Sequence, residues 1–247
     1  MDHERPPLTT YEDLARRIDH SLVRPELTDD DIRDGCELAE RYGVASVTVR
    51  PSDVDIAVRS LRGTAVAVGS VAGFPHGSQT TGAKLFECRD LIRRGAREID
   101  AVVNIGKLLS RQFQYVETEL VQMAGACRSE GVLLKVILEN AYLTQDLKII
   151  ACKIAKRAEV DFVKTSTGFA PSGCTLDDVR LLYSKCHPRV RVKAAAGVRT
   201  LEAALAVYEA GADRIGATQT AAVLDAWKAH LARRSQTAGP SDAGAAS

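Results

Sequence analysis

One pattern of apolar and polar positions recurs along the chain. A stretch with helical spacing is followed by a glycine or small turn residue, and then by a short apolar run rich in β-branched residues. A glycine after a helix supplies a left-handed cap, and the apolar run after it is typical of a buried parallel strand. The pattern occurs in RYGVASVTV (41–49), RRGAREIDAVV (93–103), SEGVLLKVIL (129–138), RAEVDFVK (157–164) and EAGADRIG (209–216). Further strand candidates are IDHSLV (18–23), AVAVGSV (65–71) and VRVKA (190–194), which gives eight strands alternating with helices.

Eight strand–helix units fit the size of one (β/α)8 barrel, which usually takes about 250 residues. A doubly wound open sheet is the structural alternative, but it usually has fewer strands, and no G-x-G-x-x-G motif follows the first strand here. We therefore predict an α/β fold, a single-domain (β/α)8 TIM barrel over residues 9–233. Residues 1–8 and 234–247 are predicted to be mobile ends, because the C-terminal stretch is rich in small and polar residues.

Composition narrows the functional classes. The chain is 45% hydrophobic, which is enough for a sizeable core, and its formal net charge of +1 gives no case for a general nucleic-acid or membrane surface. Without an N-terminal apolar segment or a bilayer-length apolar run, we expect a cytoplasmic protein. The six cysteines form no C-x-x-C pair and the five histidines lack ligand spacing, so we predict reduced, mostly buried thiols and no metal.

Charged residues lie where a barrel performs chemistry, at the C-terminal ends of its strands. Asp100 lies in EIDAVVN, Lys164 ends DFVK and Lys193 lies in VRVKA, while Asp19 in IDHS is a fourth candidate. A lysine becomes nucleophilic when a nearby cation or desolvation lowers its pKa. We hypothesise that Lys164 is a neutral amine that forms a Schiff base with a carbonyl. Lys193 would then keep its proton, and Asp100 would shuttle protons through a water.

Structural interpretations of the same residues remain open. A strand-end lysine is often a surface residue whose charged head reaches solvent, and two lysines beside an aspartate can be a structural ion-pair group. Lys135 in LLKVILE is also a lysine in a strand, and Glu139 and Asn140 are polar residues after the fifth strand without an assigned role.

An anion site is predicted after the last two strands. The segments KAAAGVRT (193–200) and RIGATQT (214–220) lead into helix N-termini, where such barrels commonly bind phosphate. Glycine lets backbone N–H groups approach the phosphate oxygens. The candidate residues are Gly168, Gly197, Val198, Gly216 and Thr218.

From about Ile18 to Leu224 the chain resembles the deoxyribose-phosphate aldolases, class I aldolases that are (β/α)8 barrels. The resemblance rests on IDHSLVRPELT, VGSVAGFPHGSQTTGAKLFE, GAREIDAVVNIGKL, LKVILE, DFVKTSTGF, VKAAAGVRT and AGADRIGA, in that order. It implies that Lys164 forms the Schiff base, that Lys193 depresses its pKa, that Asp100 acts as acid and base through water, and that Asp19 belongs to the surrounding network.

The resemblance also implies a lyase that reversibly cleaves 2-deoxy-D-ribose 5-phosphate to acetaldehyde and D-glyceraldehyde 3-phosphate, without metal or organic cofactor, in carbohydrate and deoxyribonucleotide catabolism. Two of these segments depart from the family pattern: Ala196 replaces the first of two glycines, and Thr218-Gln219 replace paired serines, which makes Gln219 a further candidate binding residue. A homodimer is expected because twofold assemblies are the commonest. The alternatives are a Schiff-base aldolase for another or unphosphorylated aldehyde, a phosphate-binding barrel isomerase and a non-catalytic scaffold.

Overall fold

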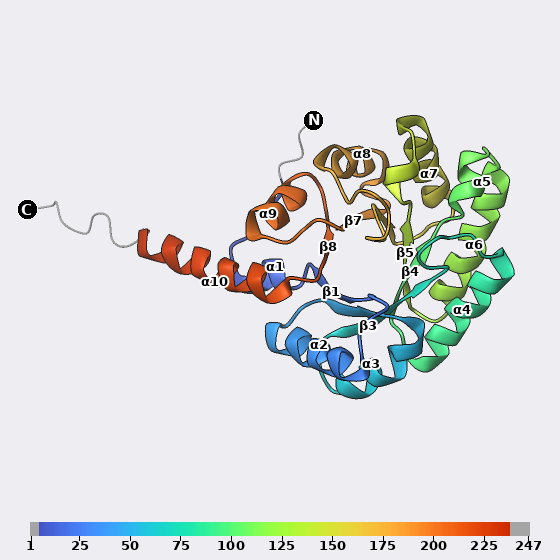
Figure 1. Ribbon diagram of the computed structural model, residues 1–247. Coiled ribbons are helices and arrows are strands. Elements are labelled where there is room, and N and C mark those ends of the chain that lie inside the picture. Colours follow the sequence, from blue (N-terminus) through green and yellow to red (C-terminus); the bar gives the residue numbers. More distant parts are fainter. Residues whose placement is uncertain (1–4, 238–247) are drawn as a thin grey trace, which may run out of the picture.

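The structure is a computed structural model that describes residues 5–237, and its centre is a closed barrel of eight parallel strands in chain order (Figure 1). The strands are β1 (Ile18–Leu22), β2 (Ser46–Val49), β3 (Ala67–Ala72), β4 (Glu98–Val102), β5 (Leu133–Ile137), β6 (Phe162–Lys164), β7 (Arg191–Ala195) and β8 (Arg214–Ala217). The predicted fold class is confirmed.

Helices cover the outside of the barrel, and α10 projects beyond it (Figure 1). The α-helices are α1 (Tyr11–Ala15), α2 (Asp29–Tyr42), α3 (Val54–Ser60), α4 (Thr81–Arg94), α5 (Ile105–Leu109), α6 (Phe113–Ser129), α7 (Gln145–Arg157), α8 (Leu176–Cys186), α9 (Leu201–Glu209) and α10 (Thr220–Thr237). Two 3₁₀ turns, η1 (Pro51–Asp53) and η2 (Asn140–Tyr142), follow β2 and β5.

Strand alternation divides the barrel into two environments. On β4, Ile99 and Ala101 belong to the hydrophobic core between the strands and the helices, whereas Glu98 and Asp100 are buried among polar partners. Because successive side chains of a strand point to opposite faces, one short segment serves both layers. The hydrophobic layer lies between the strands and the helices, and the charged side chains lie inside the barrel.

The helix ends follow from local sequence. Thr28 and Asp31 form a capping box at the start of α2, and Gly43 ends that helix with φ 59°. Thr175 caps α8 through the backbone N–H of Asp178, whose carboxylate in turn lies 2.6 Å from Lys148 Nζ. These caps fix where each helix leaves its loop.

A buried ion pair ties the helices to the end of β4. Lys84 Nζ lies 3.0 Å from Glu119 Oε1 and donates to the Val102 carbonyl at 2.7 Å, while the Asn104 N–H donates to Glu119 Oε1 at 3.1 Å. Both charged side chains are fully buried. The loop that follows Asp100 is therefore fixed from the helical layer.

The N-terminal end of the described chain packs on the barrel. The guanidinium of Arg5 lies 2.8 Å from Asp213 and 4.4 Å from the centroid of the Tyr208 ring, and Leu8 is buried. Helix α10 continues to Thr237. The other residues predicted as mobile ends, 1–4 and 238–247, lie outside the described residues.

The prediction about the cysteines can be compared directly with the structure. All six cysteines are free thiols, and five are buried, as predicted. Within residues 5–237 no helix is long and apolar enough to cross a membrane. Over the same residues, no three His, Cys, Asp or Glu side chains are grouped as a metal site.

Candidate active site

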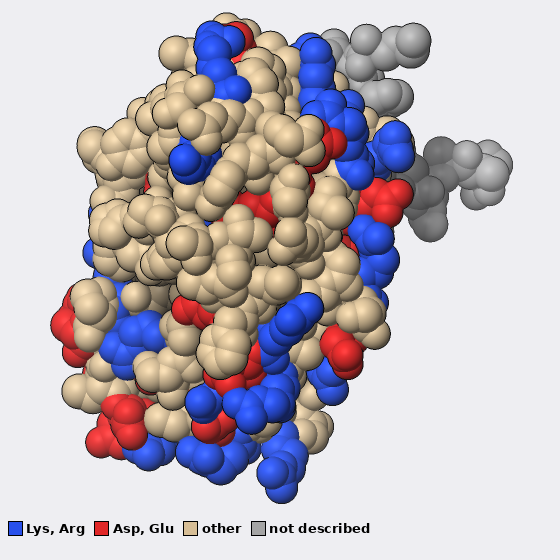
Figure 2. All heavy atoms as spheres, turned by 90° about the vertical axis from the view of Figure 1, so that its right-hand side faces the viewer, with Lys and Arg blue, Asp and Glu red and all other residues tan. Residues whose placement is uncertain are grey.

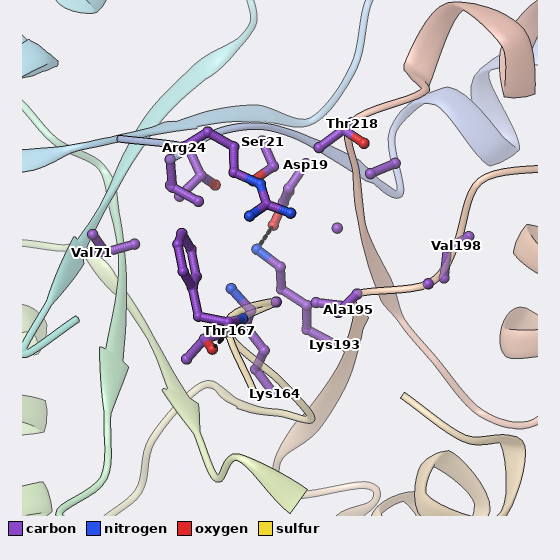
Figure 3. Close-up of a pocket in the computed structure, with 18 of the residues that line it drawn as sticks. Asp19, Ser21, Arg24, Val71, Lys164, Thr167, Lys193, Ala195, Val198 and Thr218 are labelled. Carbon is purple, nitrogen blue, oxygen red and sulfur yellow. Dashed lines mark hydrogen bonds and ion pairs between the residues drawn. The ribbon is translucent and has the colours of Figure 1, made fainter. Parts of the chain in front are cut away.

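The four predicted catalytic residues meet inside the barrel. Lys164 Nζ and Lys193 Nζ both lie 2.7 Å from Asp100 Oδ2, and Lys193 Nζ lies 2.6 Å from Asp19 Oδ2 (Figure 3). Parallel pairing explains the meeting, because Lys164 on β6 is in register with Lys193 on β7. The two amines thus share one carboxylate oxygen.

Beneath this group lie further charged residues that the sequence analysis did not assign. Lys135 Nζ is 2.8 Å from Asp100 Oδ1 and 2.6 Å from Glu98 Oε2, and Arg214 contacts both Glu98 and Asp19. We call the seven residues the charge cluster: Asp19, Glu98, Asp100, Lys135, Lys164, Lys193 and Arg214. Lys135 was noted as ambiguous, and its register partner on β4 is Asp100.

The lysines of the charge cluster differ in their access to solvent. The side chain of Lys164 is 8% exposed, against 2% for Lys193 and none for Lys135. Lys164 and Lys193 line a cavity at the mouth of the barrel, whereas Asp100 does not line it. The Lys164 amine is therefore the more accessible of the two cavity-lining amines.

Burial changes the proton affinity of these groups. It lowers the pKa of Lys164 to about 8, and the positive charge of Lys193 acts in the same direction, while Asp100 opposes both. For Lys135, burial acts to lower the pKa, but the three neighbouring carboxylates outweigh it and raise that pKa. For Asp100, burial acts to raise the pKa, yet the three lysines hold it well below its usual range. Asp100 therefore stays a carboxylate.

The hydroxyl residues after Lys164 bind the neighbouring strand ends. Thr165 Oγ1 accepts from the Ala195 N–H at 3.1 Å, and the Thr167 N–H lies 3.2 Å from both carboxylate oxygens of Glu139. The Thr167 hydroxyl also donates to Glu139, whose pKa is raised by burial. Glu139, to which the sequence gave no role, thus anchors the loop after β6.

Most of the predicted anion-site residues line the same cavity, namely Gly168, Gly197, Val198, Gly216 and Thr218. A Cβ at Gly216 would lie 3.1 Å from Ala195 Cβ and 3.5 Å from Lys193 Cε, so glycine leaves room for that lysine. Gln219 is exposed and does not belong to the cavity lining. Gln219 is the last residue before α10 and lies outside the cavity, whereas its neighbour Thr218 lines it.

The turn after β7 carries backbone strain at Ala196. Its φ is 67°, in the left-handed region that favours glycine, and Gly197 follows with φ 103°. The Ala196 carbonyl accepts from the Cys174 N–H at 2.9 Å, and a Cβ at Gly173 would lie 2.2 Å from that oxygen. This contact locks the loops after β6 and β7 together. It also holds Ala196 in a backbone conformation that is energetically unfavourable for alanine.

Comparisons with known proteins agree with this geometry. The model of the DeoC/LacD family aldolases matches residues 14–229, and the chain belongs to that family. The curated relatives include a deoxyribose-phosphate aldolase of Caldanaerobacter subterraneus subsp. tengcongensis, 44% identical over 87% of this chain and 94% of the relative. Another, from Bacteroides thetaiotaomicron, is 43% identical over 89% of this chain and 92% of its own length.

Solved structures agree as well. A tetrameric deoxyribose phosphate aldolase from Aeropyrum pernix superposes with a TM-score of 0.81 at 32% identity, covering 90% of this chain and 94% of that one.

We predict that Lys193→Leu moves the pH–rate profile of the enzyme upward. Without the neighbouring cation, the effect of Asp100 on Lys164 is less opposed and the pKa of Lys164 rises above about 8, so less free amine is present at neutral pH. Each unit of increase lowers the free-amine fraction at pH 7 about tenfold. The measurement is kcat/KM against pH for both proteins. If the midpoint of the pH–rate profile does not move, burial alone lowers the pKa of Lys164.

Ala196→Gly should stabilise the fold. A left-handed conformation costs a residue with a side chain roughly 1–2 kcal/mol, and the extra freedom of glycine in the unfolded chain takes back about 0.5–1 kcal/mol. We expect a net gain in the free energy of unfolding of about 0.5–1 kcal/mol by urea denaturation. The matched control is Ala203→Gly inside α9, which should destabilise by a similar amount because it lies in a helix. A loss of stability in Ala196→Gly would contradict the conclusion that Ala196 is strained.

Proposed function

We propose that the chain is a deoxyribose-phosphate aldolase in which Lys164 is the Schiff-base nucleophile. The observation that carries this proposal is an accessible lysine amine with a pKa near 8, placed at the mouth of a barrel of the aldolase family. The curated relatives act on deoxyribose phosphate by name and are aligned over most of the chain. The substrate is therefore proposed to be 2-deoxy-D-ribose 5-phosphate, in its open-chain aldehyde form.

The chemistry follows from the amine. Neutral Lys164 attacks the C1 aldehyde carbon, and loss of water gives a protonated imine that draws electrons from the C2–C3 bond. The C3 hydroxyl gives up its proton, the C2–C3 bond breaks and glyceraldehyde 3-phosphate leaves. The enamine that remains takes a proton at C2, and hydrolysis of the imine releases acetaldehyde and the free amine. Every step is reversible, so the same route joins the two aldehydes.

The roles of the neighbours are assigned by charge. The positive charge of Lys193 lowers the proton affinity of Lys164, while Asp19 and Asp100 hold the Lys193 amine in place. Asp100 lies below the cavity with a strongly lowered pKa, so it passes protons through a water without retaining them. This assignment keeps the acid–base role proposed for Asp100 and makes it indirect.

The substrate phosphate is proposed to bind at the loops after β7 and β8. Gly197, Val198, Gly216 and Thr218 line the cavity there, and α9 and α10 begin a few residues further on. Backbone N–H groups at helix N-termini favour phosphate. Gly168 on the β6 loop completes the proposed lining.

Lys164→Ala should lower aldolase turnover at least a thousandfold while leaving the fold intact, because no other amine with the same access replaces the nucleophile. Sodium borohydride with acetaldehyde should reduce the imine in the natural chain and attach a stable adduct to Lys164, located by peptide mass analysis. Lys153→Ala, an exposed lysine of α7, is the matched control and should behave like the natural chain.

The outcome separates the alternatives. An isomerase or a scaffold would give no adduct at Lys164, and residual turnover above one part in a thousand in Lys164→Ala would refute the covalent role. A Schiff-base aldolase for unphosphorylated aldehydes would trap acetaldehyde but would not prefer 2-deoxyribose 5-phosphate to 2-deoxyribose in a retro-aldol assay.

The homodimer and the cytoplasmic location stay predictions. An exposed apolar surface on the α4–α6 side supports self-association: Phe86 on α4 is 74% exposed, and Leu109 on α5 and Val121 on α6 are also exposed. Figure 2 shows this side of the molecule, largely uncharged across its middle, with charged side chains at its lower end, at its top and along its right-hand edge. Exposed apolar patches rimmed by polar residues are typical of subunit contacts.

Phe86→Glu should therefore weaken self-association. The side chain is mostly exposed, so a charge there costs the single chain little, whereas burying that charge in a subunit contact is unfavourable. Light scattering coupled to size exclusion should give a smaller mass for the variant than for the natural chain. Phe86→Leu is the apolar control. Equal masses for the Glu variant and the natural chain would place the contact elsewhere or show a monomer.

A further inference from the structure

An arginine reaches into the cavity from the first loop. Arg24 follows β1, lines the cavity together with Lys164 and Lys193, and its side chain points inward toward the side where Asp19 and Lys193 lie (Figure 3). Its Cζ atom lies 5.1 Å from the centroid of the Phe169 ring on the β6 loop. The sequence analysis assigned Arg24 no role.

The barrel order places the β1 loop beside the loops proposed to bind phosphate. Strand β8 is the direct neighbour of β1 in the closed barrel, and β7 follows next to β8. The Arg24 side chain lines one cavity with residues at the ends of β7 and β8. Those ends carry Gly197, Gly216 and Thr218, the residues proposed to bind phosphate.

The charge of Arg24 is unbalanced. Within residues 5–237 no carboxylate lies within ion-pair distance of its guanidinium, and the aromatic face of Phe169 is its recorded side-chain contact. Arg50, in contrast, is paired with Asp53. An unpaired guanidinium at the rim of a cavity attracts an anion and can donate two parallel hydrogen bonds to it.

Arg24 is also held in position at both ends. The guanidinium of Arg50 donates to the carbonyls of Arg24, Pro25 and Leu27 at 3.3, 2.9 and 2.9 Å, which fixes the backbone of the β1 loop. At the other end Phe169 packs edge-to-face on Phe74, with 5.4 Å between the ring centroids. The cation therefore pays less conformational entropy on binding a ligand than a free surface arginine would.

We propose that Arg24 is a specificity-determining residue that recognises the phosphate of the substrate from the side facing the β7 and β8 loops. The inference rests on the proposed function and adds a residue to it. Ala196 holds the β7 turn in a strained form and Gln219 lies outside the cavity, and both residues stand where the sequence departs from the family pattern. The Arg24 guanidinium supplies a charged contact from a different loop.

The test compares phosphorylated and unphosphorylated substrates in Arg24→Gln. A charge-assisted hydrogen bond corresponds to about a ten- to hundredfold change in affinity. We expect KM for 2-deoxyribose 5-phosphate to rise by that factor with kcat within about twofold, and kcat/KM for 2-deoxyribose to stay within about twofold. Arg24→Lys keeps the charge without the forked geometry and should fall between. Arg62→Gln, an exposed arginine after α3, is the matched control.

A second measurement needs no turnover. Inorganic phosphate should raise the Tm of the natural chain, and Arg24→Gln should require about ten- to hundredfold more phosphate for the same rise. Borohydride trapping of acetaldehyde, which carries no phosphate, should be equal in the two proteins.

The outcomes keep the two proposals apart. Absence of trapping in the natural chain defeats the proposed function, and the phosphate titration still reports on Arg24. If trapping is normal while KM and the phosphate titration are unchanged in Arg24→Gln, the role of Arg24 is overturned and the proposed function stands. An equal loss on both sugars also overturns it, because that result would mean that Arg24 only shapes the mouth.

Discussion

The site depends on a balance of charge inside the barrel. The charge cluster contains four cationic side chains and three carboxylates, all of them largely buried. With every lysine protonated, the cluster would hold one surplus positive charge, which is costly in a place removed from water. Release of a proton from the lysine with the most access to solvent removes that surplus. The nucleophilic state proposed for Lys164 therefore follows from the whole cluster, of which Lys193 is one member.

The barrel tolerates a charged interior because the hydrophobic core lies outside it, between the strands and the helices. The outward side chains of the strands, such as Val47, Ile99, Leu134 and Ile215, are fully or almost fully buried against the helical layer. Apolar burial on that side supplies the main driving force for folding. The inward positions, which in many barrels carry branched apolar residues, are then free to carry charges. Stability and chemistry thus occupy alternate residues of the same strands.

Sequence alone predicts the parts of this arrangement that depend on local pattern. Eight apolar runs give the barrel, and a lysine within or at the end of an apolar run identifies Lys193 and Lys164, although Lys193 lies in the middle of β7 and only Lys164 ends its strand. Alternation also puts Glu98 on the face of Asp100, a signal that the sequence analysis did not use. The partnership of Asp100 with Lys135 depends on strand register, which a single sequence does not display. Gln219 was assigned to the site because Thr218-Gln219 stand where the family has paired serines, but of these two residues only Thr218 lines the cavity.

The floor and the rim of the cavity are constrained differently. The charge cluster forms a floor in which each group contacts at least one partner of opposite charge, so a change in one group alters the proton affinity of the others. At the rim, the loops after β6 and β7 are locked by the close approach of Gly173 to the Ala196 carbonyl. That contact leaves little room to reshape either loop around a new ligand group. The β1 loop is fixed through its backbone by Arg50, and the side chain it presents can differ without disturbing that clamp. Recognition of the ligand charge is therefore most easily adjusted on the β1 loop, while the lysine chemistry below it remains the same.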